Sequence, residues 1–460
     1  MPIKQHRNAP LVDQGGQKKR SLHVGLLCPD LSVRIGGREL FCVNLANAMI
    51  ARGHQVTLFV PGSAGKPLHY SPDTRAQIVY ISMRYEHELI NEIRETLRSS
   101  SLDVCVAVET FWRHLFWAVA ALGSGVPYIY SERSYPEYVE NSYWNRKGRL
   151  AAMSGADAIH LLVPEYAASL PDFLRERAVV IGNPAPVVGE VAVCGKRKNT
   201  KKIISLGGMT ECKQTHLLIE AFALLAPHFP EWRLDVWGDG PCAPALQQQA
   251  ALSPFTERIA LLGYCEEPLN AFASADLFCI PSNVEGFPNA VVEALACGLP
   301  VVGYADCPGV NHLIRPGENG LLAPEMTVQS LADTLALIMR DEPFRAAMSA
   351  NAPKTVKCFA QECIFEEWEK LFYRVAACRG NTRMDSFFEE PFASMARLSA
   401  AARREYLFRD FGMPYPGTAR YFFLRARNTV KRLCKPTAVA DLRKTLWRLG
   451  MAAFKKWTGN

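Results

Sequence analysis

Short apolar runs alternate with segments of helical periodicity in the first part of the chain, beginning after residue 20. Between the runs, residues 39–51 and 88–97 repeat their apolar positions as helices do, and Gly53 closes the first of these helices. Repeated units of this kind predict a parallel sheet covered by helices. The strands are expected at His23–Cys28, Gln55–Val60, Ala76–Ile81, Val104–Val108, Tyr128–Tyr130, Ala156–Leu162 and Val179–Ile181.

The same alternation restarts after residues 184–202, a stretch with prolines, glycines and a basic run that is typical of a linker. Helices are expected at Thr215–Ala226 and Asn289–Ala296, and a closing helix at 363–378. Beyond residue 379 the pattern is lost. The second set of strands is expected at Ile203–Leu206, Arg233–Trp237, Ile259–Leu262, Leu277–Ile280 and Pro300–Gly303.

The doubled pattern predicts an α/β fold with two Rossmann-like domains, and a length of 460 residues is more than one ordinary core accommodates. Open parallel sheets bind ligands at the carboxyl ends of their strands, so two such sheets facing each other across a cleft could hold two substrates. The predicted segments are a disordered N-terminal segment 1–20, domains 21–185 and 203–362, a linker 186–202, the closing helix 363–378 and a basic aromatic tail 379–460.

The net charge of +7 is concentrated in the tail. Residues 397–460 contain 15 Lys and Arg against 3 Asp and Glu, so the remainder of the chain is net negative. Basic residues mixed with aromatic ones suit an anionic membrane surface, and a solvated, partly helical extension is the alternative. Nucleic acid is not an expected partner, because no nucleic-acid-binding motif accompanies the charge. The tail's aromatic residues include Tyr421, Phe422, Phe423, Trp447, Phe454 and Trp457.

Composition predicts a cytoplasmic protein. The 14 cysteines include no Cys-x-x-Cys pair, which argues against a zinc ribbon or a redox motif and favours a reducing compartment. The first twenty residues lack the apolar core of a signal peptide. The longest apolar candidate, residues 115–130, is interrupted by two glycines and a proline and is too short to span a bilayer. We therefore expect a protein in the cytoplasm or on the inner face of the cytoplasmic membrane.

The segment Pro281–Pro300 combines a strand end, a glycine-containing loop and a helix that begins near Pro288. The N-terminus of a helix presents backbone N–H groups, which favour an anion such as a diphosphate. Glu285 lies in the loop and Glu293 inside the helix, so the two carboxylates could accept hydrogen bonds from different hydroxyls of one ligand. On spacing alone, an ordinary strand-to-helix junction with two surface glutamates remains the alternative.

Glu285 and Glu293 are separated by seven residues and match the EX7E motif of retaining GT-B glycosyltransferases, in particular family 4. The surrounding words PSNVEGFPNAVVEALACGLPVV resemble that family throughout, and the resemblance extends over residues 21–372. It implies the GT-B fold, with the acceptor bound by the first domain and a nucleotide-sugar donor by the second. Glu285 would then hold hydroxyls of the donor sugar and Glu293 the ribose. Further donor-binding residues implied by the motif are Gly286, Phe287 and Asn289.

Other segments resemble the same family. Lys213 matches the lysine that contacts the donor diphosphate, where a cation stabilises the departing phosphate. The pair Gly36-Gly37 resembles the glycine loop of the first domain, where glycines allow a ligand to approach the backbone. Gly238 lies in a segment like the family's glycine turn after a core strand, and Gly263 lies in the segment expected beside the nucleotide base. A hairpin is implied for residues 311–321.

Two positions depart from the family pattern. Gly208 stands where an arginine usually precedes the lysine by about five residues, so one cation for the phosphates is missing. After the strand that ends at Tyr130, many relatives have a histidine near the donor sugar, whereas this chain has Ser131–Pro136, similar to the SER..P variant of some glycan assembly transferases. Glu132 or Arg133 could therefore act at the site, and a structural salt bridge is the alternative for them.

The sequence thus predicts a retaining glycosyltransferase that needs no cofactor. No Asp-x-Asp occurs, so a metal-bridged diphosphate is not indicated, and no metal site is expected. The SER..P resemblance favours a UDP-sugar donor, with a glycan or lipid-linked acceptor of cell-surface polysaccharide biosynthesis. Two alternatives stay open: a GT-B enzyme of another type, such as an epimerase or phosphorylase, and a catalytically weak GT-B scaffold that binds a nucleotide or a partner.

Overall fold

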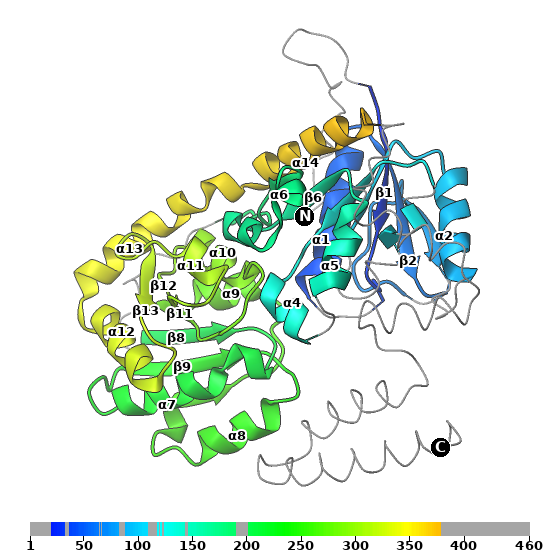
Figure 1. Cartoon of the computed structure of the whole chain (residues 1–460). Coiled ribbons are helices and arrows are strands. Elements are labelled where there is room, and N and C mark those ends of the chain that lie inside the picture. The colour runs from blue at the N-terminus through cyan, green and yellow to red at the C-terminus, as the bar shows by residue number, and fades with distance from the viewer. Residues whose placement is uncertain are drawn as a thin grey trace, which may run out of the picture.

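The structure is a computed structural model that describes residues 20–32, 36–63, 65, 67–81, 88–108, 117–118, 120–121, 124–142, 146–189 and 201–378. Two α/β domains lie side by side in it (Figure 1). The predicted N-terminal segment, apart from Arg20, and the predicted tail 379–460 lie outside the described residues, as does most of the predicted linker. No helix within the described ranges is long and apolar enough to cross a membrane.

The first domain is built on a seven-stranded parallel sheet with the order β3-β2-β1-β4-β5-β6-β7. Its central strands are buried on both faces, which explains their continuous apolar character. The strands are β1 His23–Leu27, β2 Gln55–Pro61, β3 Gln77–Ile81, β4 Val104–Ala107, β5 Tyr128–Ser131, β6 Ala158–Leu161 and β7 Ala178–Val180. The helices are α1 Gly37–Ala51, α2 Glu88–Ser99, α4 Pro136–Ser142, α5 Arg146–Ser154, η1 Pro164–Ser169 and α6 Asp172–Arg175.

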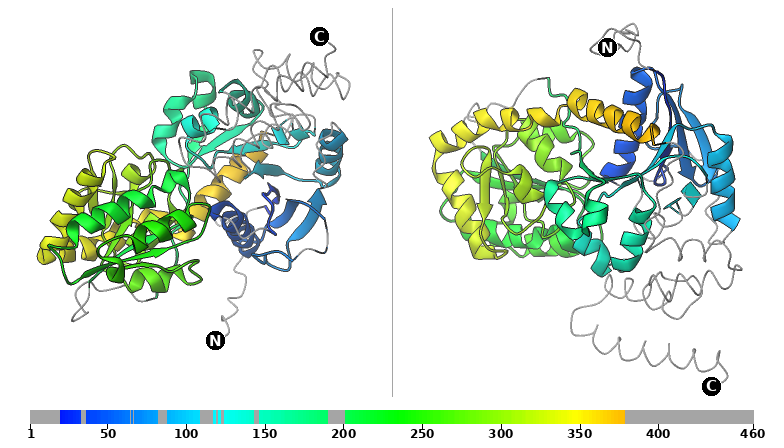
Figure 2. Two further views of the ribbon diagram at one scale, coloured as in Figure 1. Left: turned by 90° about the horizontal axis from the view of Figure 1, so that it is seen from below. Right: turned by 45° about the horizontal axis from the view of Figure 1, so that its top comes forward.

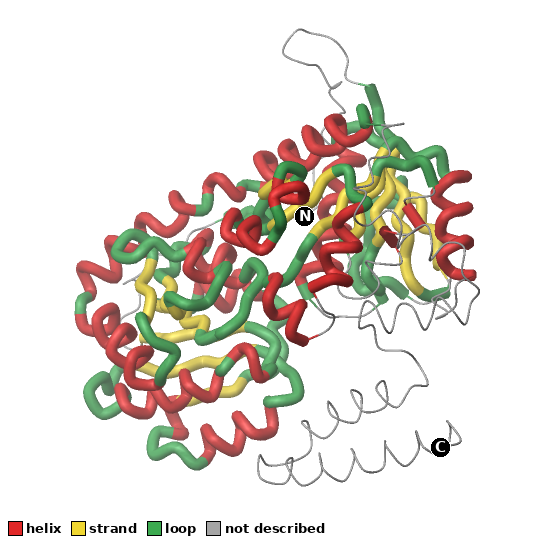
Figure 3. Tube along the Cα trace, viewed as in Figure 1, coloured by secondary structure: helices red, strands yellow, loops and turns green. Residues whose placement is uncertain are grey.

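The second domain contains a six-stranded parallel sheet with the order β10-β9-β8-β11-β12-β13. Helices cover both faces of this sheet and of the first one (Figure 3). The strands are β8 Lys201–Leu206, β9 Trp232–Trp237, β10 Ile259–Leu261, β11 Leu277–Ile280, β12 Val301–Tyr304 and β13 Gly320–Ala323. The helices are η2 Glu211–Lys213, α7 Thr215–Leu225, α8 Ala243–Ala251, η3 Thr256–Arg258, α9 Pro268–Ala273, α10 Asn289–Ala296, α11 Val310–Leu313, α12 Val328–Arg340, α13 Glu342–Thr355 and η4 Lys357–Phe359.

The predicted fold of two Rossmann-like domains is confirmed, but the hairpin implied for residues 311–321 is wrong. This segment forms α11, a tight turn at Gly317 and the start of β13, which pairs with β12 in parallel. Two parallel neighbouring strands need a crossover connection, and α11 lies in the connection from β12 to β13. The strand was missed because Gly320–Ala323 is short and follows a turn-rich stretch.

The C-terminal helix of the described chain, α14 Gln361–Ala376, returns from the second domain to the first (Figure 2). Trp368 in its middle is fully buried, and its ring lies 4.5 Å from that of His160 and 5.6 Å from that of Phe41. Glu369 lies 3.1 Å from the ring nitrogen of His54. The last described helix therefore completes the core of the first domain, which ties the two domains together.

Candidate active site

A cavity of about 420 Å³ lies between the two domains, at the carboxyl ends of their strands. Loops after β8 and β11 form its wall in the second domain, and the start of α1 and the loop after β5 form its wall in the first. The predicted residues that line it are Gly36, Gly37, Arg133, Lys213, Glu285, Gly286, Phe287, Asn289 and Glu293.

Lys213 and Glu285 form an ion pair in this cavity, with Nζ 2.5 Å from Oε1. Lys213 ends the short helix η2, and Glu285 lies in the loop between β11 and α10, 72 residues later in the chain. Burial disfavours the charge of Lys213, but the attraction of the Glu285 carboxylate outweighs it and raises the pKa of Lys213. Lys213 therefore keeps its charge at neutral pH, and the pair lies at the carboxyl end of the second sheet.

The loop that carries Glu285 is held from the other domain. The hydroxyl of Tyr166, in η1, lies 2.8 Å from the carbonyl oxygens of both Glu285 and Gly286. Burial is the largest cause of a pKa of Tyr166 well above the usual range, so this hydroxyl stays protonated and donates. Sequence reasoning missed Tyr166, because nothing in its local segment relates it to a loop about 120 residues away.

Gly286 allows the two domains to approach each other. A β-carbon at this position would lie 2.7 Å from the carbonyl oxygen of Arg133 and 3.0 Å from the α-carbon of Ser134. Backbone atoms cannot yield to such a contact, so only glycine fits. The glycine predicted to bind the donor thus has a packing role that the sequence did not indicate.

Glu293 lines the cavity from inside α10. No hydrogen bond or ion pair is made by its carboxylate among the described residues. Burial raises its pKa from the ordinary value of 4.5 to about 7. An unpaired carboxylate in a cavity wall can accept hydrogen bonds from ligand hydroxyls. Phe287, in the loop before the helix, is buried and packs its ring 5.4 Å from that of Phe359.

A polar bridge crosses the cavity wall between the domains. Asn183, just after β7, donates from Nδ2 to Oδ1 of Asn289 at 2.7 Å. Asn289 begins α10, and a β-carbon on Gly37 would lie 2.5 Å from its Nδ2. Gly36, the residue before Gly37, has a φ of 102°, a conformation that favours glycine. Steric constraints therefore account for glycine at both positions. The position of Asn183 directly after a strand was the signal that could have identified it.

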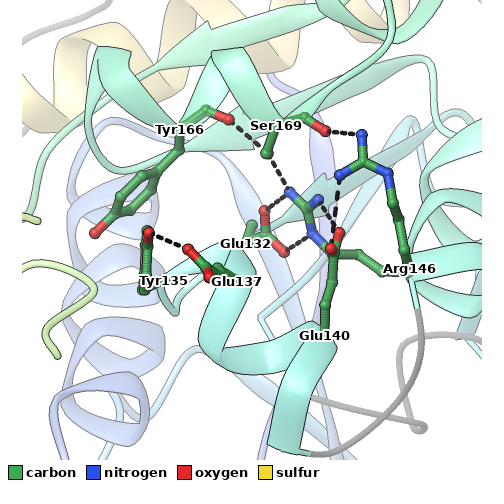
Figure 4. A network of polar contacts seen from close by, with 8 residues as sticks. Glu132, Tyr135, Glu137, Glu140, Arg146, Tyr166 and Ser169 are labelled. Atoms are coloured by element: carbon green, nitrogen blue, oxygen red, sulfur yellow. Dashed lines mark hydrogen bonds and ion pairs between the residues drawn. The ribbon is translucent and has the colours of Figure 1, made fainter.

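The adjacent residues Glu132 and Arg133 have different surroundings. Glu132 is buried and accepts two hydrogen bonds from Arg149, at 2.5 and 2.7 Å, and Arg149 also donates to Glu140 at 2.9 Å. Figure 4 shows this network, with the carboxylates of Glu132 and Glu140 directed toward the one guanidinium that both contact. Glu132 therefore forms a structural salt bridge, the alternative to a role in the site that the sequence left open. Arg133, in contrast, lines the cavity.

Gly238 and Gly263 do not line the cavity within the part of the chain that the structure describes. The backbone nitrogen of Gly238 donates to the carbonyl oxygen of Gly263 at 2.7 Å. A β-carbon on Gly238 would lie 1.9 Å from the carbonyl oxygen of Gly207, so this glycine allows two strand-end loops to pack. Their neighbour Trp237 lines the cavity instead.

Gly208 also lines the cavity and is exposed. A β-carbon there would meet a single atom within 4 Å, the carbonyl oxygen of Asp239 at 4.0 Å. The wall therefore has room for a β-carbon at this exposed position, and it carries no side chain there.

Two family descriptions match the sequence. Residues 36–184 match the glycosyl transferase 4-like domain, and residues 190–355 match the glycosyl transferases group 1. Together they cover both domains described above.

The relatives below match about three quarters of the chain. The chain is 25% identical over 343 residues to an uncharacterized glycosyltransferase of Haemophilus influenzae, covering 73% of this chain and 96% of the relative. It is 25% identical over 352 residues to a Campylobacter jejuni α-1,4-N-acetyl-D-galactosaminyltransferase whose name specifies a diphospho-undecaprenol-linked substrate. This match covers 74% of this chain and 96% of the relative.

A solved structure shows the same fold. Anabaena HepE, crystallised with UDP and glucose, superposes with a TM-score of 0.62 at 18% identity, covering 77% of this chain and all of that one.

Proposed function

Because the chain is a GT-B glycosyltransferase that resembles family 4, we propose that it transfers a sugar from a UDP-sugar to a glycan or lipid-linked acceptor in cell-surface polysaccharide biosynthesis. The observation that carries this proposal is the ion pair of Lys213 and Glu285 at the carboxyl end of the second sheet, in one cavity with Glu293. UDP is supported by its presence in the crystals of HepE, and the acceptor class by the name of the Campylobacter relative.

Each charged group has a role in the proposed transfer. Lys213 would exchange its contact with Glu285 for the donor diphosphate and neutralise the phosphate as the glycosidic bond breaks. Glu285 would then accept hydrogen bonds from hydroxyls of the donor sugar, and Glu293 from those of the ribose. Backbone N–H groups at the start of α10, near Gly286 and Asn289, would add to the phosphate site. Transfer would proceed with retention at the anomeric carbon and without a metal.

Activity is tested by supplying the purified protein with a series of UDP- and GDP-sugars and measuring nucleotide release with and without candidate lipid-linked acceptors. Wild type should release UDP, and Lys213→Ala should lose at least about 100-fold of that rate because a charge in a dry site is removed. Addition of EDTA should leave the rate unchanged. The coupling constant of the anomeric proton in the product, measured by NMR, should report retention.

A scaffold that binds a nucleotide without turnover is the second candidate, and Gly208 favours it. The position leaves one wall of the cavity without a side chain, so the phosphates have one cation fewer in the second domain. UDP binding by the wild type, with no release from any donor or acceptor tried, would support this candidate over the enzyme.

Membrane association is proposed from the composition of the tail alone. Residues 397–460 carry 15 Lys and Arg against 3 Asp and Glu, and several aromatic residues. These residues lie outside the described ones. Deletion of residues 397–460 should abolish sedimentation with phosphatidylglycerol vesicles and leave UDP binding intact. Equal binding of both proteins to such vesicles would contradict the proposal.

A further inference from the structure

Three arginines are buried in the part of the chain that the structure describes, and two of them face a carboxylate. Arg149 pairs with Glu132 at 2.5 Å and with Glu140 at 2.9 Å. Arg345 lies 3.4 Å from Glu342 and donates to the carbonyl oxygens of residues 338 and 339. This is the arrangement expected of structural arginines, because a buried charge is costly unless it is paired.

Arg133 is the third, and no carboxylate pairs with it in the described structure. Its Nη2 donates to Oδ1 of Asn183 at 2.5 Å, and its guanidinium lies 3.9 Å from the centre of the Phe41 ring. Nε and Nη1 are buried and have no hydrogen-bond acceptor among the described residues. Two donors of a buried cation are therefore unsatisfied, which native structures rarely tolerate without a functional reason.

The surroundings make this cation more costly still. Burial is the largest cause that lowers the pKa of Arg133, to about 9, and the charge of Arg38 lowers it further. At neutral pH the guanidinium nevertheless remains protonated, since the pKa lies above the pH. The fold thus maintains a positive charge that no described carboxylate neutralises, and an anion would relieve this cost.

Arg133 is also placed beside the proposed donor site. It lines the same cavity as Lys213 and Glu285, from the opposite domain. Its backbone carbonyl contacts Gly286, the residue next to Glu285. Through Asn183 it connects to Asn289 at the start of α10. The unneutralised charge therefore borders the loop and helix start that we propose hold phosphate.

We propose that Arg133 is an anion-binding residue of the cavity, and that its guanidinium binds the diphosphate of the nucleotide donor from the first domain while Lys213 binds it from the second. This inference rests on the proposed function, since it assigns the anion to the donor. The planar guanidinium offers paired donors that match phosphate oxygens, and its stacking on Phe41 fixes their plane. The donor would then be clamped by both domains.

The test is calorimetric binding of UDP, uridine and inorganic pyrophosphate to wild type and to Arg133→Met, which keeps the length of the side chain without its charge. The affinity for UDP and pyrophosphate should fall at least about tenfold, because a charged hydrogen-bonded contact is lost. The affinity for uridine should stay within about twofold of the wild type, because uridine carries no phosphate. Arg315→Met removes an exposed charge outside the cavity and should change none of the three.

A rescue variant separates binding from structure. Gly208 lines the cavity and has room for a side chain, so Gly208→Arg in the Arg133→Met background should recover a substantial part of the pyrophosphate affinity. Thermal unfolding of Arg133→Met should occur at or above the wild-type temperature, because an unneutralised buried charge is removed. Arg133→Gln serves as a second neutral variant, and failure of both to fold would make the residue structural and overturn the proposal.

Two further outcomes distinguish a failure of this inference from a failure of the proposed function. Unchanged UDP and pyrophosphate affinity in Arg133→Met, in a protein whose wild type binds UDP, overturns this inference and leaves the proposed function standing. The same is true if only the KM for a lipid-diphosphate acceptor rises, since the anion would then belong to the acceptor. A wild type that binds neither UDP, GDP nor pyrophosphate refutes the proposed function itself.

Discussion

The hydroxyl of Tyr166 in the first domain lies 2.8 Å from the carbonyl oxygen of Glu285 in the second. Because it also lies 2.8 Å from the carbonyl oxygen of Gly286, one buried donor serves two successive peptide groups of the loop. This contact links the conformation of the loop, and hence the position of the Glu285 carboxylate, to the closure of the two domains. Figure 4 shows Tyr166 with its hydroxyl turned away from the neighbouring ionic network.

Replacement of Tyr166 with phenylalanine should therefore affect the reaction more than the fold. Two buried carbonyl oxygens lose their donor, which should cost roughly 1–3 kcal/mol of stability. We expect kcat/KM for sugar transfer to fall about tenfold, because the Glu285 loop is no longer held against the first domain. Steady-state kinetics and urea unfolding measure the two effects.

Tyr135→Phe is the matched control, because the hydroxyl of Tyr135 donates to Glu137 on its own domain at an exposed site. Its rate and stability should stay close to those of the wild type. Equal losses in both variants would show that the contact with the Glu285 loop has no special part in the reaction.

Substitution of Gly286 by alanine should destabilise the closed arrangement. The added β-carbon would lie 2.7 Å from the carbonyl oxygen of Arg133, and backbone atoms cannot move away without separating the domains. Strain of this kind typically costs about 1–3 kcal/mol. Thermal unfolding should show a lower midpoint, and UDP affinity should fall as well. Gly189→Ala, where nothing lies within 4 Å of the new carbon, should show neither change.

Glu293 should make the stability of the protein depend on pH. Its pKa is raised by burial from 4.5 to about 7, so the folded protein favours the protonated carboxyl. The stabilisation is complete below pH 4.5 and is lost as the pH rises through 7. At pH 8, ionised Glu293 should cost up to about 3 kcal/mol relative to pH 4.

Urea unfolding of Glu293→Gln and wild type at pH 4.5 and pH 8 measures this effect. The free energy of unfolding of the variant should exceed that of the wild type more at pH 8 than at pH 4.5, by up to about 3 kcal/mol. A difference between the two proteins that does not vary with pH would show that the carboxyl titrates normally in the fold.

The ion pair of Glu132 and Arg149 should be essential to the fold rather than to the chemistry. Both side chains are buried, and Arg149→Met leaves the Glu132 carboxylate without its cation, which should cost about 3–5 kcal/mol. The double variant Glu132→Gln with Arg149→Met should recover much of this loss, because no unpaired charge remains.

Arg98→Met breaks an exposed ion pair with Glu95 and should cost less than about 1 kcal/mol. Urea unfolding of the four proteins measures the comparison. A double variant as unstable as Arg149→Met would mean that packing around the arginine, rather than its charge, holds this region together.

Sequence periodicity was sufficient for the architecture. The strands of the two sheets are continuous apolar runs because they are buried on both faces, and that pattern is local and legible in the chain. The short strand β13 was not predicted, because four residues after a turn give too little hydrophobic pattern to identify a strand. The spacing of Glu285 and Glu293 likewise placed two carboxylates that the structure brings to one cavity with Lys213.

What the sequence by itself determined is therefore the pair of sheets and the segments that supply most of the cavity wall. Only the tertiary structure decided between Glu132 and Arg133, since adjacent residues at the end of a strand can face opposite surroundings: one meets the buried Arg149 and the other the cavity. It also brought Tyr166 and Asn183 to the second domain. Such contacts depend on how two domains pack, and residues more than 100 positions apart carry no local pattern that predicts their meeting.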